Sequence, residues 1–137
     1  MSSDYILHIE TSADICSVAL GEGGEFLDQM QDNTPRNHAG ILTVLIETLI
    51  ERNRIEMNKL RAIAVSGGPG SYTGLRIGVS AAKGMTWGLE IPLIAVPTTE
   101  AMVCGILDRQ KQLPGEIRDN PDAIFCPVID ARRMEVY

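Results

Sequence analysis

The order of its apolar runs constrains the fold of this 137-residue chain more than any other feature. Three short apolar runs come first, each bounded by turn-forming residues, and they predict strands over residues 5–10, 15–20 and 25–30. Consecutive strands joined by such short turns pair antiparallel. We therefore expect a three-stranded meander at the start of the chain.

Helical and extended patterns alternate after the meander. Apolar residues recur at helical spacing in three segments, which predict helices over residues 38–53, 73–89 and 98–109. Further apolar runs predict strands over residues 61–66, 92–96 and 123–130, with a polar linker at 110–122. The order β-β-β-α-β-α-β-α-β predicts an α/β fold, a mixed sheet with helices on both faces. It is the order of the ribonuclease-H-like domain, which is also the half-domain of actin-like ATPases.

Composition excludes several classes of protein. A net charge of −6 provides no overall basic balance for unaided nucleic-acid binding. No apolar run approaches the roughly 20 residues that a membrane helix needs, and the N-terminus lacks the basic segment of a signal peptide. We therefore expect a cytoplasmic protein without a membrane partner, folded as one domain over residues 1–137.

Cysteine and histidine are too sparse to predict a metal centre. Cys16, Cys104 and Cys126 lie far apart in apolar surroundings, which predicts buried free thiols. With only His8 and His38 available, no metal site is expected. Neither histidine has a spacing that marks it as the base of a serine nucleophile, so we predict no catalytic residues.

A glycine-rich segment at residues 66–76 separates a predicted strand from a predicted helix, where backbone N–H groups can bind an anion. It lacks the lysine of a P-loop, and Thr73 stands where a dinucleotide fingerprint needs glycine or alanine. A phosphate loop and a tight turn that permits close backbone approach both stay open. Glu10 likewise reads as a phosphate-loop acid or as a solvated turn residue. The candidate phosphate or nucleotide residues are Glu10, Thr11, Ser12, Gly68, Gly70, Ser71 and Thr73.

The first two predicted helices carry features of a partner surface. One has an apolar stripe wider than a single sheet contact requires, and the other is rich in glycine, serine and alanine. Glycine costs about 1 kcal/mol relative to alanine inside a helix, so another backbone is expected to approach closely. That backbone belongs either to the domain's own sheet or to another chain. The candidate interface residues are His38, Ile41, Leu42, Leu45, Leu49, Arg76, Ile77, Ser80, Ala81 and Gly84.

Several motifs, taken in order, resemble the bacterial TsaB (YeaZ) family of tRNA threonylcarbamoyladenosine biosynthesis proteins. They are IETS at residues 9–12, His38, GPGSYTGLRIG at 68–78, AKG at 82–84 and DARRMEVY at 130–137. The glycine-loop motif and the terminal motif are both specific, and together they cover the chain from Ile6 to its end.

The resemblance implies an actin-like fold and a role in forming the t6A base at position 37 of tRNA. It implies a non-catalytic scaffold that binds a TsaD-like catalytic subunit through its first two helices and helps to recruit a TsaE-like ATPase. Self-association into a homodimer through the same surface is also implied, with tRNA contacted only through the complex. The catalytic relative needs a pair of histidines on a helix, and this helix offers only His38.

The resemblance also sets what the chain is expected to lack. The family continues into a second actin-like lobe, so residues 1–137 are expected to represent the N-terminal lobe alone. A single lobe does not enclose a nucleotide, so no cofactor is expected and ATP binding is expected to be weak. Two alternatives stay open: an actin-like phosphotransferase or ATPase half-domain using residues 10–14 and 67–73, and a glycoprotease-like peptidase.

Overall fold

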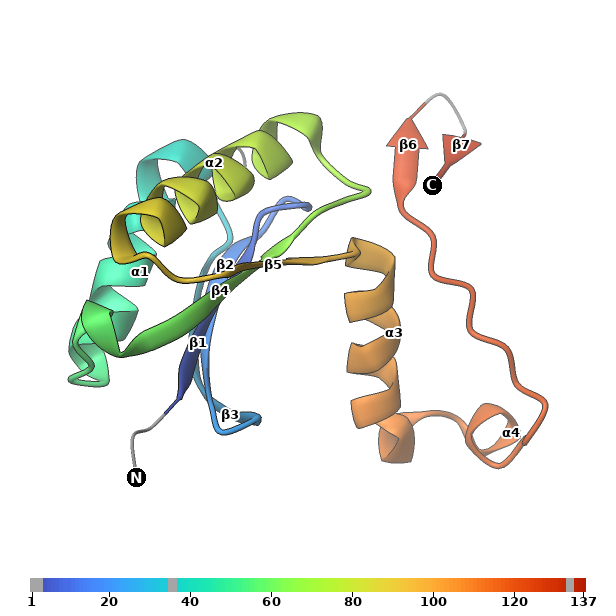
Figure 1. Ribbon diagram of the computed structural model, residues 1–137. Coiled ribbons are helices and arrows are strands. Elements are labelled where there is room, and N and C mark those ends of the chain that lie inside the picture. Colours follow the sequence, from blue (N-terminus) through green and yellow to red (C-terminus); the bar gives the residue numbers. More distant parts are fainter. Residues whose placement is uncertain (1–3, 35–36, 133–134) are drawn as a thin grey trace.

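The computed structural model describes residues 4–34, 37–132 and 135–137. Its centre is a five-stranded mixed sheet in the order β3-β2-β1-β4-β5 (Figure 1). The strands are β1 (Tyr5–Glu10), β2 (Cys16–Glu22), β3 (Glu25–Asp32), β4 (Leu60–Ser66) and β5 (Leu93–Val96). The helices are α1 (His38–Arg52), α2 (Tyr72–Leu89), α3 (Thr98–Asp108) and α4 (Gly115–Arg118), with single 3-10 turns at Met57–Lys59 and Gln110–Gln112.

The predicted meander and crossovers are confirmed. β1 pairs antiparallel with β2, and β2 pairs antiparallel with β3, because short turns join them. β4 lies parallel to β1 and β5 lies parallel to β4, since a helix separates each pair in the sequence. The α/β class is therefore confirmed, with most element ends within a residue or two of the predicted ones.

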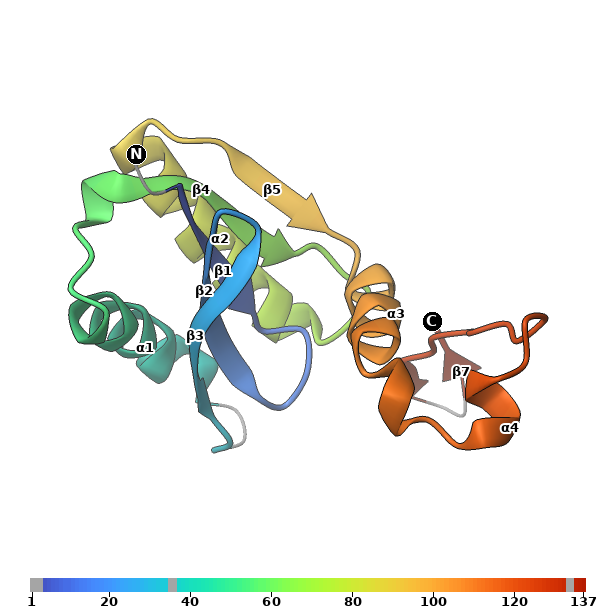
Figure 2. The same ribbon diagram turned by 90° about the horizontal axis from the view of Figure 1, so that it is seen from below.

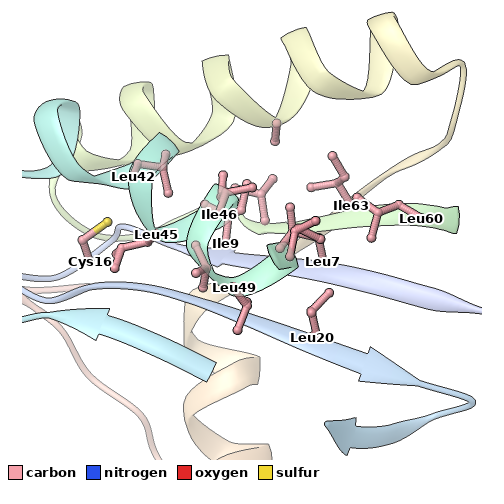
Figure 3. Packing of buried hydrophobic residues seen from close by; sticks show 14 residues of the cluster. Leu7, Ile9, Cys16, Leu20, Leu42, Leu45, Ile46, Leu49, Leu60 and Ile63 are labelled. Carbon is pink, nitrogen blue, oxygen red and sulfur yellow. The ribbon is translucent and has the colours of Figure 1, made fainter. Parts of the chain in front are cut away.

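The hydrophobic core lies between the sheet and the α1–α2 layer (Figure 3). In β1, burial alternates with the strand period, so Leu7 and Ile9 face α1 and are almost fully enclosed. α2 adds only one fully buried apolar side chain, Ala82, because its small residues bring its backbone close to the sheet. The other buried members include Cys16, Leu20, Leu42, Leu45, Ile46, Leu49, Leu60 and Ile63.

This core corrects four of the interface candidates. His38, Leu42, Leu45 and Leu49 are 7%, 2%, 5% and 0% exposed, so they do not present side chains to a partner. The wide stripe of α1 is explained by its position, because the helix contacts β2, β3 and α2 together. A helix packed against several neighbours needs an apolar face broader than one sheet contact.

The sequence predicted helices on both faces of the sheet, but fewer helices cover the face opposite α1 and α2. α1 and α2 lie side by side on one face, whereas α3 stands beyond the end of β5, away from them (Figures 1 and 2). The free thiols of Cys104 on α3 and Cys126 are consequently exposed, and only Cys16 is buried as predicted.

The strand predicted over residues 123–130 is mostly wrong. Only β6 (Asp130–Arg132) forms there, paired with β7 (Glu135–Val136) in a separate two-stranded sheet. No described group hydrogen-bonds to the backbone of residues 124–128, and Pro127 has no N–H to offer. An apolar extended run becomes a strand only where a neighbouring edge accepts it.

None of the helices in the described ranges has both the length and the apolarity needed to cross a bilayer.

Candidate functional site

Residues of the IETS motif and of the glycine-loop motif meet where β1 ends and α2 begins. The turn between β1 and β2, residues 11–15, lies directly against the start of α2. Thr11 and Ser12 are 0% and 4% exposed there. The amide of Ser71, the N-cap residue of α2, donates to the Ser12 carbonyl oxygen at 2.7 Å. The hairpin loop and the glycine loop therefore form one packed unit.

Two helix glycines make this contact possible. A Cβ on Gly74 would overlap the carbonyl oxygen of Thr11, and a Cβ on Gly78 would overlap its Oγ1. The opposite holds further along α2, where Gly84 and Gly88 have no heavy atom near the place a Cβ would occupy. At the start of α2, the backbone that approaches the helix closely is thus the chain's own turn at Thr11. Towards the end of α2, no part of the described fold explains the glycines.

Some of the backbone N–H groups at the N-terminus of α2 have hydrogen-bond acceptors within the chain. Ser71 Oγ accepts from the Gly74 amide at 3.2 Å, as an N-cap serine should, while Ser12 supplies the second acceptor. Among the described residues none accepts from the amides of Tyr72 and Thr73. These two amides could donate to a phosphate, and a role of the loop in phosphate binding stays a prediction.

Glu10 links the hairpin loop to the end of β4 through two hydrogen bonds. Its Oε1 accepts from the Ser12 amide at 2.6 Å, and its Oε2 accepts from the Ser66 hydroxyl at the end of β4. Both oxygens of the half-buried carboxylate are therefore engaged, unlike those of a fully solvated turn acid. Within the described ranges, no three His, Cys, Asp or Glu side chains gather as a metal site would require.

His38 holds the other side of the hairpin loop. It is the first residue of α1, and its Nε2 donates to the carbonyl oxygen of Ala13 at 2.9 Å. The donor role follows from the acceptor, because a carbonyl oxygen can only accept.

Nearby Cys16 is not a nucleophile, since burial, with Asp32 and Glu10 adding to it, raises the pKa of its thiol to about 11.

A shallow hollow of about 180 Å³ lies on the far face of the sheet. Its lining includes Glu10 and the row formed by Ala19, His8 and Ala64, which are paired across β2, β1 and β4. Partial desolvation lowers the pKa of the His8 imidazole, which favours its neutral form. Among the described residues, no hydrogen bond joins either histidine to a serine.

The outer faces of α1 and α2 carry the remaining interface candidates. Of these, Ile41, Ile77 and Ala81 are half-buried and pack against the hydrophobic core. Arg76, Ser80 and Gly84 are exposed on α2.

Three large exposed side chains on these faces are not among the interface candidates predicted from the sequence. Trp87 is 88% exposed, Tyr72 is 74% exposed beneath the Arg76 guanidinium at 5.4 Å, and Val44 of α1 is 48% exposed. Helical spacing from Ser80 could have found Trp87, which lies seven residues further along the same helix. We call Val44, Tyr72, Arg76, Ser80, Gly84 and Trp87 the outer platform.

The chain matches one family along most of its length. A sequence model of the TsaD family, described as tRNA N6-adenosine threonylcarbamoyltransferase, matches residues 32–137. The chain is 33% identical to the tRNA threonylcarbamoyladenosine biosynthesis protein TsaB of Escherichia coli (strain K12), over 96% of this chain and 52% of that protein. It is 31% identical to the protein of the same name from Bacillus subtilis (strain 168), over 96% of this chain and 52% of that one.

A solved structure supports the same assignment. YeaZ from Pseudomonas aeruginosa superposes with a TM-score of 0.80 at 28% identity, covering 99% of this chain and 58% of that one. The chain spans about half the length of the curated relatives it matches. Family match, relatives and fold thus agree with the motifs: the chain belongs to the TsaD family of sequences, on the branch of TsaB, also called YeaZ.

Proposed function

We propose that this chain is a non-catalytic scaffold in the t6A37 modification of tRNA, in which it binds a TsaD-like catalytic subunit. It also helps to recruit a TsaE-like ATPase, and it contacts tRNA only through the complex. The names of its relatives place them in this biosynthesis. The observation that carries the proposal for this chain is the outer platform, with Trp87 88% exposed at its end.

The chemistry of the outer platform suits a protein partner. Tryptophan, tyrosine and arginine are the residues most enriched among those that dominate binding energy at protein interfaces. Trp87, Tyr72 and Arg76 lie on one helix, beside glycines that no part of the described fold requires. Gly84 and Gly88 leave room for a partner backbone to approach α2, which would offset their cost of about 1 kcal/mol each in a helix.

The hydrogen bonds of the polar motif residues support a non-catalytic role. Glu10 and Ser66 bond to each other, and His38 bonds to a backbone carbonyl. In these positions they hold the fold together. The net charge of −6 supports an indirect route to tRNA, because phosphate binding rests on basic side chains.

Size-exclusion chromatography with light scattering tests the proposal, using the chain alone and mixed with the TsaD-like protein of the same organism. We expect a one-to-one complex, and a homodimer through the outer platform when the chain is alone. Trp87→Ala should weaken the complex at least about 30-fold, the loss typical of a tryptophan that dominates binding energy at an interface. Phe26→Ala is the matched control, because Phe26 is 68% exposed on β3 at the edge of the sheet. A folded chain that forms no complex contradicts the proposal.

One alternative has an observation in its favour. The amides of Tyr72 and Thr73 have no described acceptor, which is what an actin-like nucleotide-binding half-domain would offer to phosphate. ATP that binds only the folded chain would raise its melting temperature by mass action. We expect little or no shift at millimolar ATP, and a shift of several degrees would favour the alternative.

A further inference from the structure

The turn between β1 and β2 joins the starts of α1 and α2. Two consecutive carbonyl groups of this turn each hold one helix: Ser12 accepts from the Ser71 amide at 2.7 Å, and Ala13 accepts from His38 Nε2 at 2.9 Å. His38 is the first residue of α1 and Ser71 caps α2. The turn is therefore a bridge between the N-terminal ends of the two helices that form the outer platform.

Glu10 fixes this bridge to the sheet. One carboxylate oxygen holds the Ser12 amide at 2.6 Å, and the other holds the hydroxyl of Ser66. Ser66 ends β4, and the chain runs from it through the glycine loop into α2. The same carboxylate thus restrains both the turn and the strand that leads to the second helix.

The outer platform is built from two helices, so its shape depends on how they sit relative to each other. α1 and α2 contact each other, and both pack on the core through apolar side chains, which have no directional preference. Directional hydrogen bonds at the helix ends set a spacing that apolar contacts alone leave loose.

We propose that Glu10 and His38 are positioning residues for partner binding: by holding the turn they fix the spacing of α1 and α2. The inference rests on the proposed function and names residues that touch no partner. His38 is 7% exposed, and Glu10 is half-buried beneath the loop. Their role is to hold the outer platform in the shape that the partner recognises.

Calorimetric titration of the TsaD-like partner into folded variants tests the inference. Among the described residues, His38→Ala removes the one side-chain hydrogen bond between α1 and the turn, and we expect affinity to fall about tenfold. His38→Gln should recover most of the loss, because a glutamine Nε2 can donate to the Ala13 carbonyl. Ser66→Ala, a milder change than Glu10→Ala, should weaken binding in the same direction.

A control separates positioning from simple loss of stability. Leu60→Val lowers stability in the core beside Tyr5, at the opposite end of β1 from Glu10. Measured well below every melting temperature, this variant should bind as tightly as the parent chain. If His38→Ala and Ser66→Ala also bind like the parent, the positioning role is overturned while the proposed function stands. If the parent chain itself fails to bind, both fall.

Discussion

Gly78→Ala and Gly84→Ala add the same methyl group to the same helix, and we expect Gly84→Ala to stabilise the chain while Gly78→Ala gains nothing or destabilises it. Gly84 has open space where the methyl would go, so the change gains the full helix propensity difference of about 1 kcal/mol. At Gly78 the methyl would overlap Thr11 Oγ1, and it would lie 3.3 Å from both Cβ and Cγ2 of that residue.

The magnitude at Gly78 follows from these contacts. Thr11 is fully buried and its loop is held on both sides, so the methyl must push α2 away from the sheet. Overpacking of this kind costs about 1 to 3 kcal/mol. Because the propensity gain is common to both variants, the difference between them measures the overlap itself, about 1 to 3 kcal/mol. A chain of this length shifts its Tm by roughly 3 to 5 °C for each kcal/mol.

Urea unfolding followed by circular dichroism measures the difference, with the m-value checked for constancy. Trp87 fluorescence is a poor probe here because the side chain is already 88% exposed. Thr11→Ala combined with Gly78→Ala should recover part of the loss, since it removes Oγ1 and Cγ2. If Gly78→Ala is as stable as Gly84→Ala, α2 is not held against Thr11 and the packing described for this region is incorrect.

Three further predictions concern single groups. Thr11→Val should raise the free energy of unfolding by about 1 kcal/mol, because Thr11 Oγ1 is buried without a described hydrogen-bond partner; a loss in urea unfolding would show that the hydroxyl is bonded. Hydrogen bonds from a neighbouring asparagine and arginine lower the pKa of Asp28, so its contribution to stability is present above about pH 4 and is lost as pH falls through its folded pKa. Asp28→Asn should therefore flatten the acid limb of the stability profile, and an unchanged limb would contradict the assignment. Cys104 and Cys126 should react with a thiol reagent in the native state while Cys16 does not, and labelling of Cys16 without unfolding would contradict its burial.

The parts of the fold that the sequence predicts are those marked by local apolar patterns. The apolar run of β1 is bounded by turn-forming residues, and the apolar stripe of α1 recurs at helical spacing, so the order and approximate ends of these elements follow. The strand at 123–130 could not be judged in this way, since a strand also needs an edge to pair with, and that depends on parts of the fold remote in sequence.

Within the candidate site, the sequence likewise could not tell which residues face the fold and which face solvent. Gly78 and Gly84 look alike in the sequence, yet one meets Thr11 and the other meets open space. The apolar stripe of α1 likewise does not reveal that Leu45 faces inward while Val44 faces out. Such distinctions depend on the rotation of each helix against the sheet, which only the packed structure fixes.

Titration calorimetry of the TsaD-like partner against the parent chain, Trp87→Ala and Phe26→Ala tests the central claim most directly. The scaffold account predicts a one-to-one complex that Trp87→Ala weakens at least about 30-fold and Phe26→Ala leaves unchanged. Equal binding by all three would place the interface away from the outer platform. No binding by the folded parent chain would contradict the scaffold role itself.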